Sequence, residues 1–503
     1  SNAVFAVVNI ITRRGRDVKT LEASGEAGSF NTYKGRLTYG NSFQNGLEAV
    51  ISGSLYDSKG PRHLFFQEFD SPDTNHGITD HTDYDRFHSS FAKLSYHDFT
   101  VEGAYVSRTK GIPTASFGID FNDPRNKTVD WTGYLDLKYE RSLTSKLAVM
   151  GRIFYEYYGY SGDYIYGGVA NKDLTRGDWW RGELKVMSGL LDEHKIIVGA
   201  EYQANIRQVQ KNYDEDPYFL YLDDKRHSSI SALYIQDEFT LHKKLILDAG
   251  VRYDHYSTFG STTNPRLALI YNPFEKTFFK LLYGRAFRAP NVFELYYHTA
   301  LGPTKGNPDL KPEKISTYEL VYEQYIGTYL RATATGFYYK INDLITQTTD
   351  PADNALVYKN LGKVSAKGIE LEIEAKSPSG YEGRISYSFH KAEDATTGEI
   401  LSNSARHLAK LNITVPFVRE KVFLGIEEQY TSRRKTLSGN DAKSFYVTNV
   451  TIFSRNLLKN LEASVSMYNL FDCRYGDPGA EEHLQDTIRQ DGRTFRLKLT
   501  YRF

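Results

Sequence analysis

The chain has 503 residues, of which 40% are hydrophobic and 25% charged, and its 62 Lys and Arg are balanced by 62 Asp and Glu. This balance excludes the basic surface of a nucleic-acid-binding protein, and the single cysteine excludes an internal disulfide framework or a Cys-rich metal site. The mean hydropathy is −0.51, and no run of about 18 apolar residues exists to form a membrane-spanning helix. The unusual feature is the aromatic content of 14%, with 39 Tyr and 29 Phe.

Ten short segments divide the chain into longer stretches that are rich in polar and aromatic residues. They lie at residues 43–46, 98, 143–146, 191–194, 241–244, 272–276, 326–328, 377–380, 418–420 and 456–460. On both sides of each segment apolar and polar residues alternate, with the period of an extended strand that has two unlike faces. Counting the alternating runs predicts about 22 strands joined as consecutive hairpins, a size at which a barrel has a wide lumen that can hold a plug.

The alternation is cleanest in the second half of the chain. Ile369, Leu371 and Ile373 share one face, and the other face carries Glu370, Glu372 and Glu374. A soluble β-sandwich would alternate too, but the number of consecutive hairpins favours an all-β, transmembrane antiparallel β-barrel with short periplasmic turns and long extracellular loops. In this register we expect Leu371 to face lipid and Glu372 to face the lumen. Tyrosine pairs such as 157–158 and 338–339 fall near predicted strand ends, where amphipathic rings belong at a membrane interface.

The last residues form another amphipathic strand, which ends at an aromatic carboxy-terminus. Its apolar face contains Phe495, Leu497, Leu499, Tyr501 and Phe503. Such an ending resembles the signal by which outer-membrane barrels are recognised for assembly, so Phe503 is predicted to be read by the barrel assembly machinery.

Three segments resemble the family of TonB-dependent outer-membrane receptors. Residues 2–13 (NAVFAVVNIITR) are similar to the end of that family's plug domain; residues 287–291, 294–296 and 306–313 resemble a signature loop; and residues 468–472, followed by Tyr475, resemble a penultimate-strand motif. The resemblance implies that residues 1–14 are the C-terminal tail of the plug and that residues 15–503 are the barrel. Most of the plug, and any segment that contacts TonB, is expected to be missing from this chain.

The resemblance also implies a function for the full-length protein. It would be a receptor and active transporter, not an enzyme, that binds a scarce, bulky solute and is driven by the inner-membrane TonB complex. A ferric siderophore is the preferred solute, with haem and cobalamin as alternatives; each would be a transported ligand rather than a cofactor. A passive pore and an outer-membrane enzyme are the other classes, although the sequence contains no recognisable catalytic constellation. The remaining expectations are an outer-membrane location, contact with lipid, no nucleic-acid partner and a monomeric state.

Candidate ligand contacts come from two predicted loops, residues 160–180 and 286–315. They are aromatic rings that can stack on flat ligands, a cation that can pair with an anionic complex, and one histidine: Tyr164, Tyr166, Trp179, Trp180, Arg288, Phe293, Tyr296, Tyr297 and His298. His298 lies between the FRAP and NPDL segments, as does the iron-ligating histidine of haem receptors, whereas Trp179 and Trp180 could instead anchor the membrane interface. The loop acids Asp70, Asp73, Asp80, Asp83, Asp214, Glu215 and Asp216 lack the spacing of a known calcium loop, and no resident metal is expected.

The luminal row Glu370, Glu372 and Glu374 would repel itself unless positive charge lies opposite. We expect Arg13 or Arg14 of the plug tail to help neutralise this row, with a wet lumen wall as the alternative.

Overall fold

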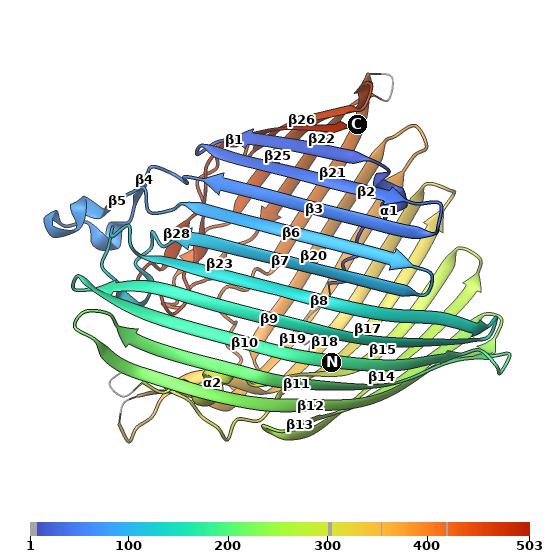
Figure 1. Ribbon diagram of the computed structural model, residues 1–503, viewed down its shortest axis with the longest axis horizontal. Helices are drawn as coiled ribbons and strands as arrows, with labels where there is room; N and C mark the ends of the chain where they lie inside the picture. The colour runs from blue at the N-terminus through green and yellow to red at the C-terminus, as the bar shows by residue number, and fades with distance from the viewer. Residues whose placement is uncertain (1–7, 300–303, 354, 419–420) are drawn as a thin grey trace.

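The computed structural model describes residues 8–299, 304–353, 355–418 and 421–503, and these form a closed antiparallel β-barrel of 22 strands (Figure 1). The predicted fold class is therefore confirmed. The barrel strands are β1 (Leu21–Gly28), β2 (Thr32–Ser42), β3 (Leu47–Ser58), β6 (Asp85–Tyr96), β7 (Phe99–Gly111), β8 (Lys127–Thr144), β9 (Leu147–Tyr166), β10 (Val169–Ser188), β11 (His194–Asp214), β12 (Phe219–His242), β13 (Leu245–Tyr256), β14 (Gly260–Phe274), β15 (Thr277–Arg288), β17 (Glu313–Ile326), β18 (Leu330–Thr349), β19 (Leu356–Lys376), β20 (Glu382–Asp394), β21 (His407–Val418), β22 (Val422–Thr431), β25 (Phe445–Leu458), β26 (Leu461–Tyr468) and β29 (Thr494–Arg502).

The sheet closes because the last strand pairs with the first. The β1–β29 ladder runs from Glu22 opposite Arg502 to Gly28 opposite Arg496, and each barrel strand pairs with the next along the chain. Closure leaves no edge strand, so backbone N–H and C=O groups in the wall are bonded to neighbouring strands even where water is absent. No helix in the described ranges is long and apolar enough to cross a membrane.

Each of the ten predicted turns falls at a connection between consecutive barrel strands at one end of the barrel, which we call the turn end, and several overlap the ends of the strands that they join. In the first of them Phe43 and Leu47 share a backbone hydrogen bond of 2.8 Å, and Gly46 adopts a φ of 86°, a conformation that favours glycine. Part of the turn at 418–420 lies outside the described residues.

The opposite end, the loop end, has connections of unequal length (Figure 1). Only a two-residue turn, Gly167–Gly168, joins β9 to β10, whereas other connections contain short elements of their own. These are β4 (His63–Phe65), η1 (Gln67–Phe69), η2 (Pro72–Gly77), β5 (Ile78–Asp80), η3 (Ser116–Gly118), α2 (Val292–Tyr296), β16 (Thr304–Lys305), β23 (Arg434–Lys435), β24 (Asp441–Ala442), β27 (Gly476–Pro478) and β28 (Thr487–Arg489).

The segment before β1 identifies the inner face of the wall. Thr12 accepts a 2.8 Å hydrogen bond from Lys93 and donates one of 3.4 Å to Glu102, and Arg13 lies 3.5 Å from Glu22. The short helix α1 (Gly15–Val18) then packs Val18 against Gly40 of β2. The described residues of the predicted plug tail therefore lie against the lumen wall, while residues 1–7 lie outside the described part.

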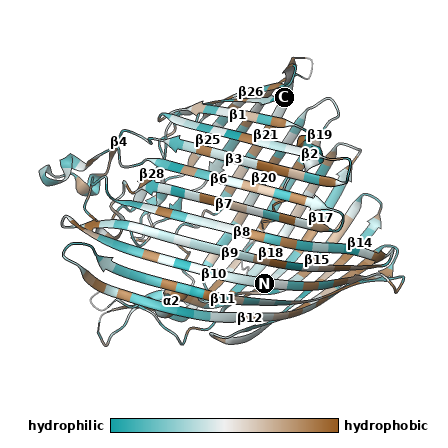
Figure 2. Ribbon diagram, in the orientation of Figure 1, coloured by the Kyte–Doolittle hydropathy of each residue, from teal (hydrophilic) through white to brown (hydrophobic). Residues whose placement is uncertain are grey.

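Residues opposite each other on neighbouring strands lie on the same face of the sheet, so the register shows which residues of the other strands face the lumen. Hydrophilic and hydrophobic residues alternate along the strands (Figure 2). On β19 the apolar residues Ile369 and Leu371 face outward, with 53% and 47% of their surface exposed, and the alternate residues Glu370 and Glu372 face the lumen. The predicted register of this strand is therefore correct.

The proposed neutralisation of the glutamate row by the plug tail is wrong for two of its members. Arg331 of β18 lies 3.2 Å from Glu372 and 2.8 Å from Glu374, and Arg384 of β20 lies 3.5 Å from Glu374. These guanidinium groups come from the two neighbouring strands, so the wall supplies its own counter-charge. Arg13 pairs with Glu22 instead.

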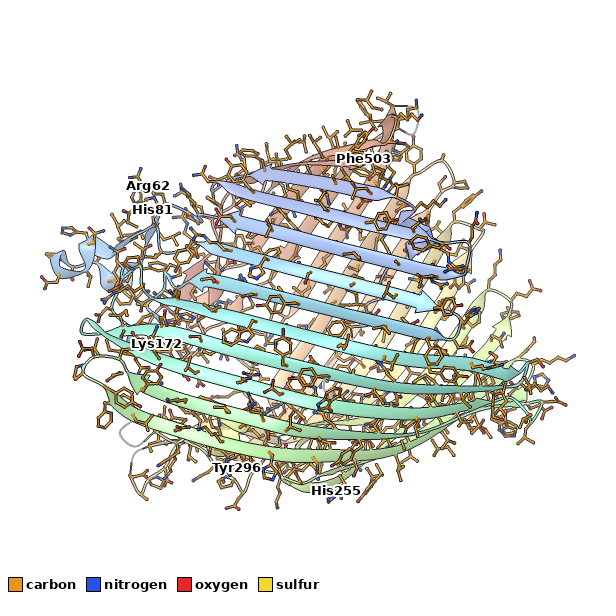
Figure 3. The ribbon with its side chains drawn as sticks, viewed as in Figure 1. Arg62, His81, Lys172, His255, Tyr296 and Phe503 are labelled. Atoms are coloured by element: carbon orange, nitrogen blue, oxygen red, sulfur yellow. The ribbon has the colours of Figure 1, made fainter. Side chains whose placement is uncertain are left out.

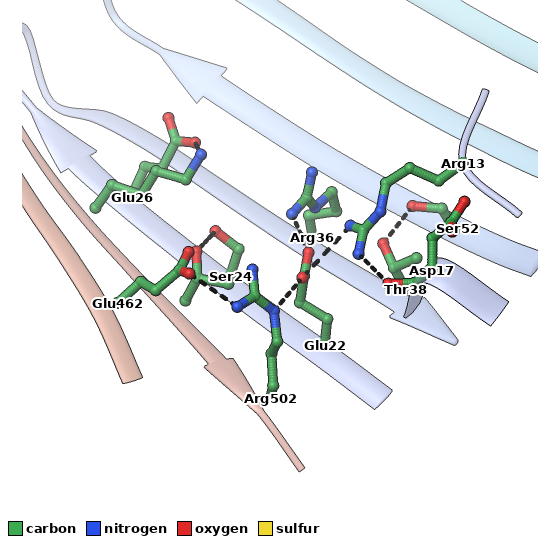
Figure 4. A network of polar contacts seen from close by, with 12 residues as sticks. Arg13, Asp17, Glu22, Ser24, Glu26, Arg36, Thr38, Ser52, Glu462 and Arg502 are labelled. Carbon is green, nitrogen blue, oxygen red and sulfur yellow. Dashed lines mark hydrogen bonds and ion pairs between the residues drawn. The ribbon is translucent and has the colours of Figure 1, made fainter. Parts of the chain in front are cut away.

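Glu22 is the centre of an ionic network at the seam (Figure 4). This carboxylate is only 3% exposed, and it lies 2.5 Å from Arg36 and 3.1 Å from Arg502, in addition to Arg13. Arg502 also forms an ion pair of 2.8 Å with Glu462 of β26. One carboxylate therefore joins the segment before the barrel, the second strand and the last strand.

We expect Leu371→Arg to destabilise the folded barrel by about 2–4 kcal/mol, because it places a charge on the lipid face near the middle of the span. Ser388→Arg is the matched control, since Ser388 stands opposite the luminal Glu370 and the new charge remains in a wet lumen. Folding into lipid vesicles in a urea titration measures both variants. Equal losses in the two would contradict the assigned register.

Replacing Glu22 by Ala should cost about 3 kcal/mol, because it leaves Arg13, Arg36 and Arg502 without the buried carboxylate that they share. Glu462→Ala, which removes the more exposed outer partner of Arg502, should cost less than about 1 kcal/mol. The same urea titration compares them, and a similar small cost for both would show that the seam does not depend on Glu22.

Candidate ligand-binding site at the loop end

The region predicted as a loop between residues 160 and 180 is a continuous hairpin instead. β9 and β10 pair without interruption from Leu147–Ser188 to Tyr166–Val169. Asp120 of the neighbouring β7–β8 connection accepts hydrogen bonds of 2.8 and 2.7 Å from the N–H groups of Gly167 and Gly168. These bonds hold the tip of a hairpin that extends beyond the wall.

The two tryptophans of β10 face opposite sides of the sheet, as their adjacent positions require. Trp180 faces outward, is 47% exposed and packs against Tyr155 with ring centroids 4.8 Å apart. Trp179 stands opposite Glu156 on the inner face. The interface position therefore fits Trp180 only.

Tyr164 is buried at the inner side of the hairpin tip, and Tyr166 ends the strand. Tyr164 is 8% exposed, packs with Ala115 and Ile119, and has its hydroxyl against that of Tyr160. Burial raises the pKa of the Tyr164 phenol, and burial also raises the pKa of Tyr166 to about 12. Both phenols are therefore neutral hydrogen-bonding groups at physiological pH.

Arg288 is held by carboxylates of its own loop. Its guanidinium contacts Glu313 at 2.7 and 2.8 Å and Glu294 at 3.0 Å twice, and these hydrogen bonds, first that to Glu313, raise its pKa further. Glu294 also caps α2, because it accepts from the N–H of Asn291 while Asn291 accepts from the N–H of Glu294. Arg288 thus holds the start of residues 291–298, which we call the α2 segment.

The α2 segment presents an aromatic group toward the lumen. The ring of Phe293 packs against that of Tyr297 in a tilted arrangement, with centroids 4.3 Å apart. The Arg226 guanidinium lies 3.6 Å from the centroid of the Tyr296 ring. Tyr296 is labelled in Figure 3. Next to them His298 is exposed. Phe293, Tyr296, Tyr297 and His298 are therefore brought together, whereas Trp180 lies on the far side of the wall.

One hydrogen bond joins the α2 segment to the hairpin. The Tyr297 hydroxyl donates to Oδ2 of Asp173 on β10 at 3.1 Å, across 124 positions of sequence. Burial, opposed in part by hydrogen bonds from Tyr297 and Asn212, raises the pKa of Asp173 to about 6. Sequence reasoning missed Asp173, because nothing local distinguishes it from the other acids of β10.

A second feature that the sequence did not reveal is a chamber on the inner side of β20–β26. This cavity of about 970 Å³ is lined by residues from several strands and loops, among them His390, Ser404, Arg434, Phe445, Tyr475 and Asp491. Phe445 and Tyr475 stack at 4.1 Å. Arg434 is 11% exposed and lies 2.5 Å from Asp477, and its Nε has no acceptor among the described residues. The chamber therefore combines a paired aromatic surface with an arginine that is paired with Asp477, a carboxylate that also lines the cavity.

The acids that could have suggested calcium have protein partners in several cases. Asp83 pairs with Lys110, and Asp214 accepts from Tyr221 at 2.7 Å and from Asn171 at 2.9 Å. Within the described ranges no group of three or more His, Cys, Asp or Glu side chains is arranged to hold a metal ion.

Comparison with known proteins places this geometry in a family. The family model "TonB dependent receptor-like, beta-barrel" matches residues 25–470. The vitamin B12 transporter BtuB of Vibrio cholerae is 30% identical over 276 residues, covering 51% of this chain and 40% of that protein. The heme/hemopexin utilization protein C of Haemophilus influenzae is 24% identical over 332 residues, covering 57% of this chain and 46% of that protein. Less than half the length of either relative is therefore matched.

Solved structures give the same architecture at low identity. The ferric-catecholate import receptor Fiu from K12 E. coli superposes with a TM-score of 0.76 at 15% identity, covering 96% of this chain and 82% of that one. The FrpB iron transporter of Neisseria meningitidis gives 0.75 at 16% identity, covering 98% and 83%.

Docking of the α2 segment should depend on pH through Asp173. Since the pKa of this carboxyl is raised to about 6 in the docked state, docking is most stable below about pH 4 and loses this contribution as the pH rises through about 6. Hydrogen exchange of residues 292–297, corrected for the intrinsic rate at each pH, should be slower at low pH. In Asp173→Asn the difference should vanish, and a persisting difference would assign it to another group.

Proposed function

Because the chain belongs to the family of TonB-dependent receptor β-barrels, we propose that its full-length protein is an outer-membrane active transporter of a scarce, bulky nutrient. The observation that carries this proposal is the segment of residues 8–14 inside a closed barrel, with Arg13 attached to the wall at Glu22. A peptide that enters the lumen supports a gated path more than a passive pore. The family's members are transporters rather than enzymes.

A ferric siderophore is the proposed solute, and the chamber provides the supporting chemistry. Ferric siderophore complexes are commonly anionic. A terminal nitrogen of Arg434 can form a charge-assisted hydrogen bond to such a ligand by exchanging its present partner, Asn403 or Gly476, for the ligand. The stacked Phe445 and Tyr475 can pack against flat catechol rings. Phe293, Tyr296, Tyr297 and His298 remain proposed contacts at the opposite side of the loop end, with Tyr164 and Tyr166 at the hairpin tip.

Two other solutes have specific support. The 30% identity to a vitamin B12 transporter favours cobalamin, and the exposed His298 beside aromatic rings favours haem. Each would use the same barrel and differ in the groups that touch the ligand.

The proposed partners follow from the family. TonB would act on the plug of the full-length protein, and the assembly machinery would read the carboxy-terminal strand. The N–H of Phe503 donates to the carbonyl of Leu21 at 2.9 Å, so the same residue also completes the seam. The barrel is proposed to act as a monomer.

Arg434→Gln should weaken binding of a ferric tricatecholate by about tenfold or more, the value of a hydrogen bond to a charged group. Arg433→Gln is the matched control, because the neighbouring Arg433 is 77% exposed and pairs with Asp441. Quenching of intrinsic fluorescence, measured with ferric tricatecholate, haemin and cyanocobalamin, reports the affinity.

Cyanocobalamin lacks the negative charge, so its binding should be unchanged in Arg434→Gln. If only cyanocobalamin or only haemin quenches the fluorescence, that compound and not a ferric siderophore is the solute. If the two arginine variants lose the same affinity for ferric tricatecholate, the chamber is not the binding site. That result would not contradict the proposal that the protein is a transporter.

A further inference from the structure

Four cations lie side by side on the outer surface of the wall formed by β15–β20, the far wall in Figure 1. We call them the outer cation row: Arg285, Lys340, Lys367 and Lys391. Arg285 and Lys340 both stand opposite Ser316 of β17, and Lys367 stands opposite Lys391. Their outward direction follows from register, because Lys367 alternates with the outward Ile369 and Leu371 on β19.

The row lies at the upper edge of the lipid-facing band. Three tyrosines of neighbouring strands form an aromatic row just below Arg285 and Lys340, with ring centroids 5.2 Å apart for Tyr283 and Tyr318 and 6.3 Å for Tyr318 and Tyr338. Lys367 stands opposite Tyr338, so it lies level with the tyrosines. Arg285 and Lys340 lie two residues beyond Tyr283 and Tyr338 on the same strands, farther from the turn end. Tyrosines mark the membrane interface, so the cations are at the level of the lipid head groups of the outer leaflet.

The charge of this row is only partly balanced by the protein. Lys391 forms an ion pair with Glu393, but no carboxylate in the described part of the chain lies within ion-pair distance of Arg285, Lys340 or Lys367. Like charges directly opposite each other on antiparallel strands are unfavourable, and Lys367 stands directly opposite Lys391. The inner face of the same strands behaves differently, since Arg331 is paired there with Glu372 and Glu374.

We propose that the outer cation row is a binding site for the phosphate groups of a lipid in the outer leaflet. A phosphate between Lys367, Lys391 and Lys340 would relieve their repulsion and accept hydrogen bonds from several ammonium groups. The acyl chains of the same lipid would then lie along Leu320, Ile369 and Leu371, which are exposed on the outer face below the row. Clusters of Lys and Arg at a membrane surface bind anionic lipids in this way.

The phosphate could belong to a lipid or be free in solution, and the experiment distinguishes these sources. The 503-residue chain is folded in nonionic micelles, and retention of diphosphoryl lipid A is measured by native mass spectrometry. Lipid A from which the phosphates have been removed and a large excess of inorganic phosphate are the comparison ligands. We expect one diphosphoryl lipid to be retained, little retention without phosphates, and no displacement by inorganic phosphate.

Lys340→Gln/Lys367→Gln should weaken retention by about thirtyfold, and Lys340→Arg/Lys367→Arg should keep it. The matched control is Lys243→Gln/Lys459→Gln, which removes two exposed cations at the turn end and should bind as the parent does. Heat-dependent mobility on gels verifies that each variant is folded. Unchanged retention in the first variant, or an equal loss in the control, would overturn the proposal, and displacement by inorganic phosphate would overturn the lipid as its source.

Discussion

A backbone amide or carbonyl in hydrocarbon has no water to bond, so a strand that crosses a membrane needs a paired neighbour on each side. In this chain the requirement brings β29 beside β1, although almost the whole sequence separates them. The seam is also where Glu22 gathers Arg13, Arg36 and Arg502. The contact that completes the barrel is thus the contact that holds the segment entering its lumen, and sheet closure and attachment of residues 8–14 share one carboxylate.

The structural features that could be predicted from the sequence are those that depend on neighbouring residues. Turns and alternation are local, so the ten turns and the outward direction of Leu371 followed from neighbouring residues alone. The extent of a hairpin beyond the membrane is not local, because a strand can continue past the lipid with the same alternation. For that reason residues 160–180 were expected to form a loop. Since they form a hairpin instead, the adjacent Trp179 and Trp180 face opposite sides of the sheet.

The candidate site depends on contacts that only the closed sheet creates. The counter-charges of Glu372 and Glu374 come from β18 and β20, and the partner of Tyr297 lies on β10. The chamber combines Arg434, Phe445 and Tyr475 from separate connections and strands. No spacing rule joins such positions, whereas the FRAP and NPDL segments were recognisable because their residues are close in sequence. Arg288 shows the limit of that recognition, since its position was predicted but its four hydrogen bonds to two carboxylates were not.

The two faces of one wall treat charge differently, and this difference connects the fold to its surroundings. On the inner face, water and neighbouring strands are both available, and Arg331 and Arg384 balance the glutamates of β19 within the protein. On the outer face of the same strands, hydrocarbon begins just below the tyrosine row, so a carboxylate placed there as a counter-ion would be costly. A cation can extend its long side chain toward the head groups, where mobile phosphates are abundant. The outer face can therefore leave Lys340 and Lys367 without a carboxylate partner in the protein, because in our proposal the membrane supplies the opposite charge.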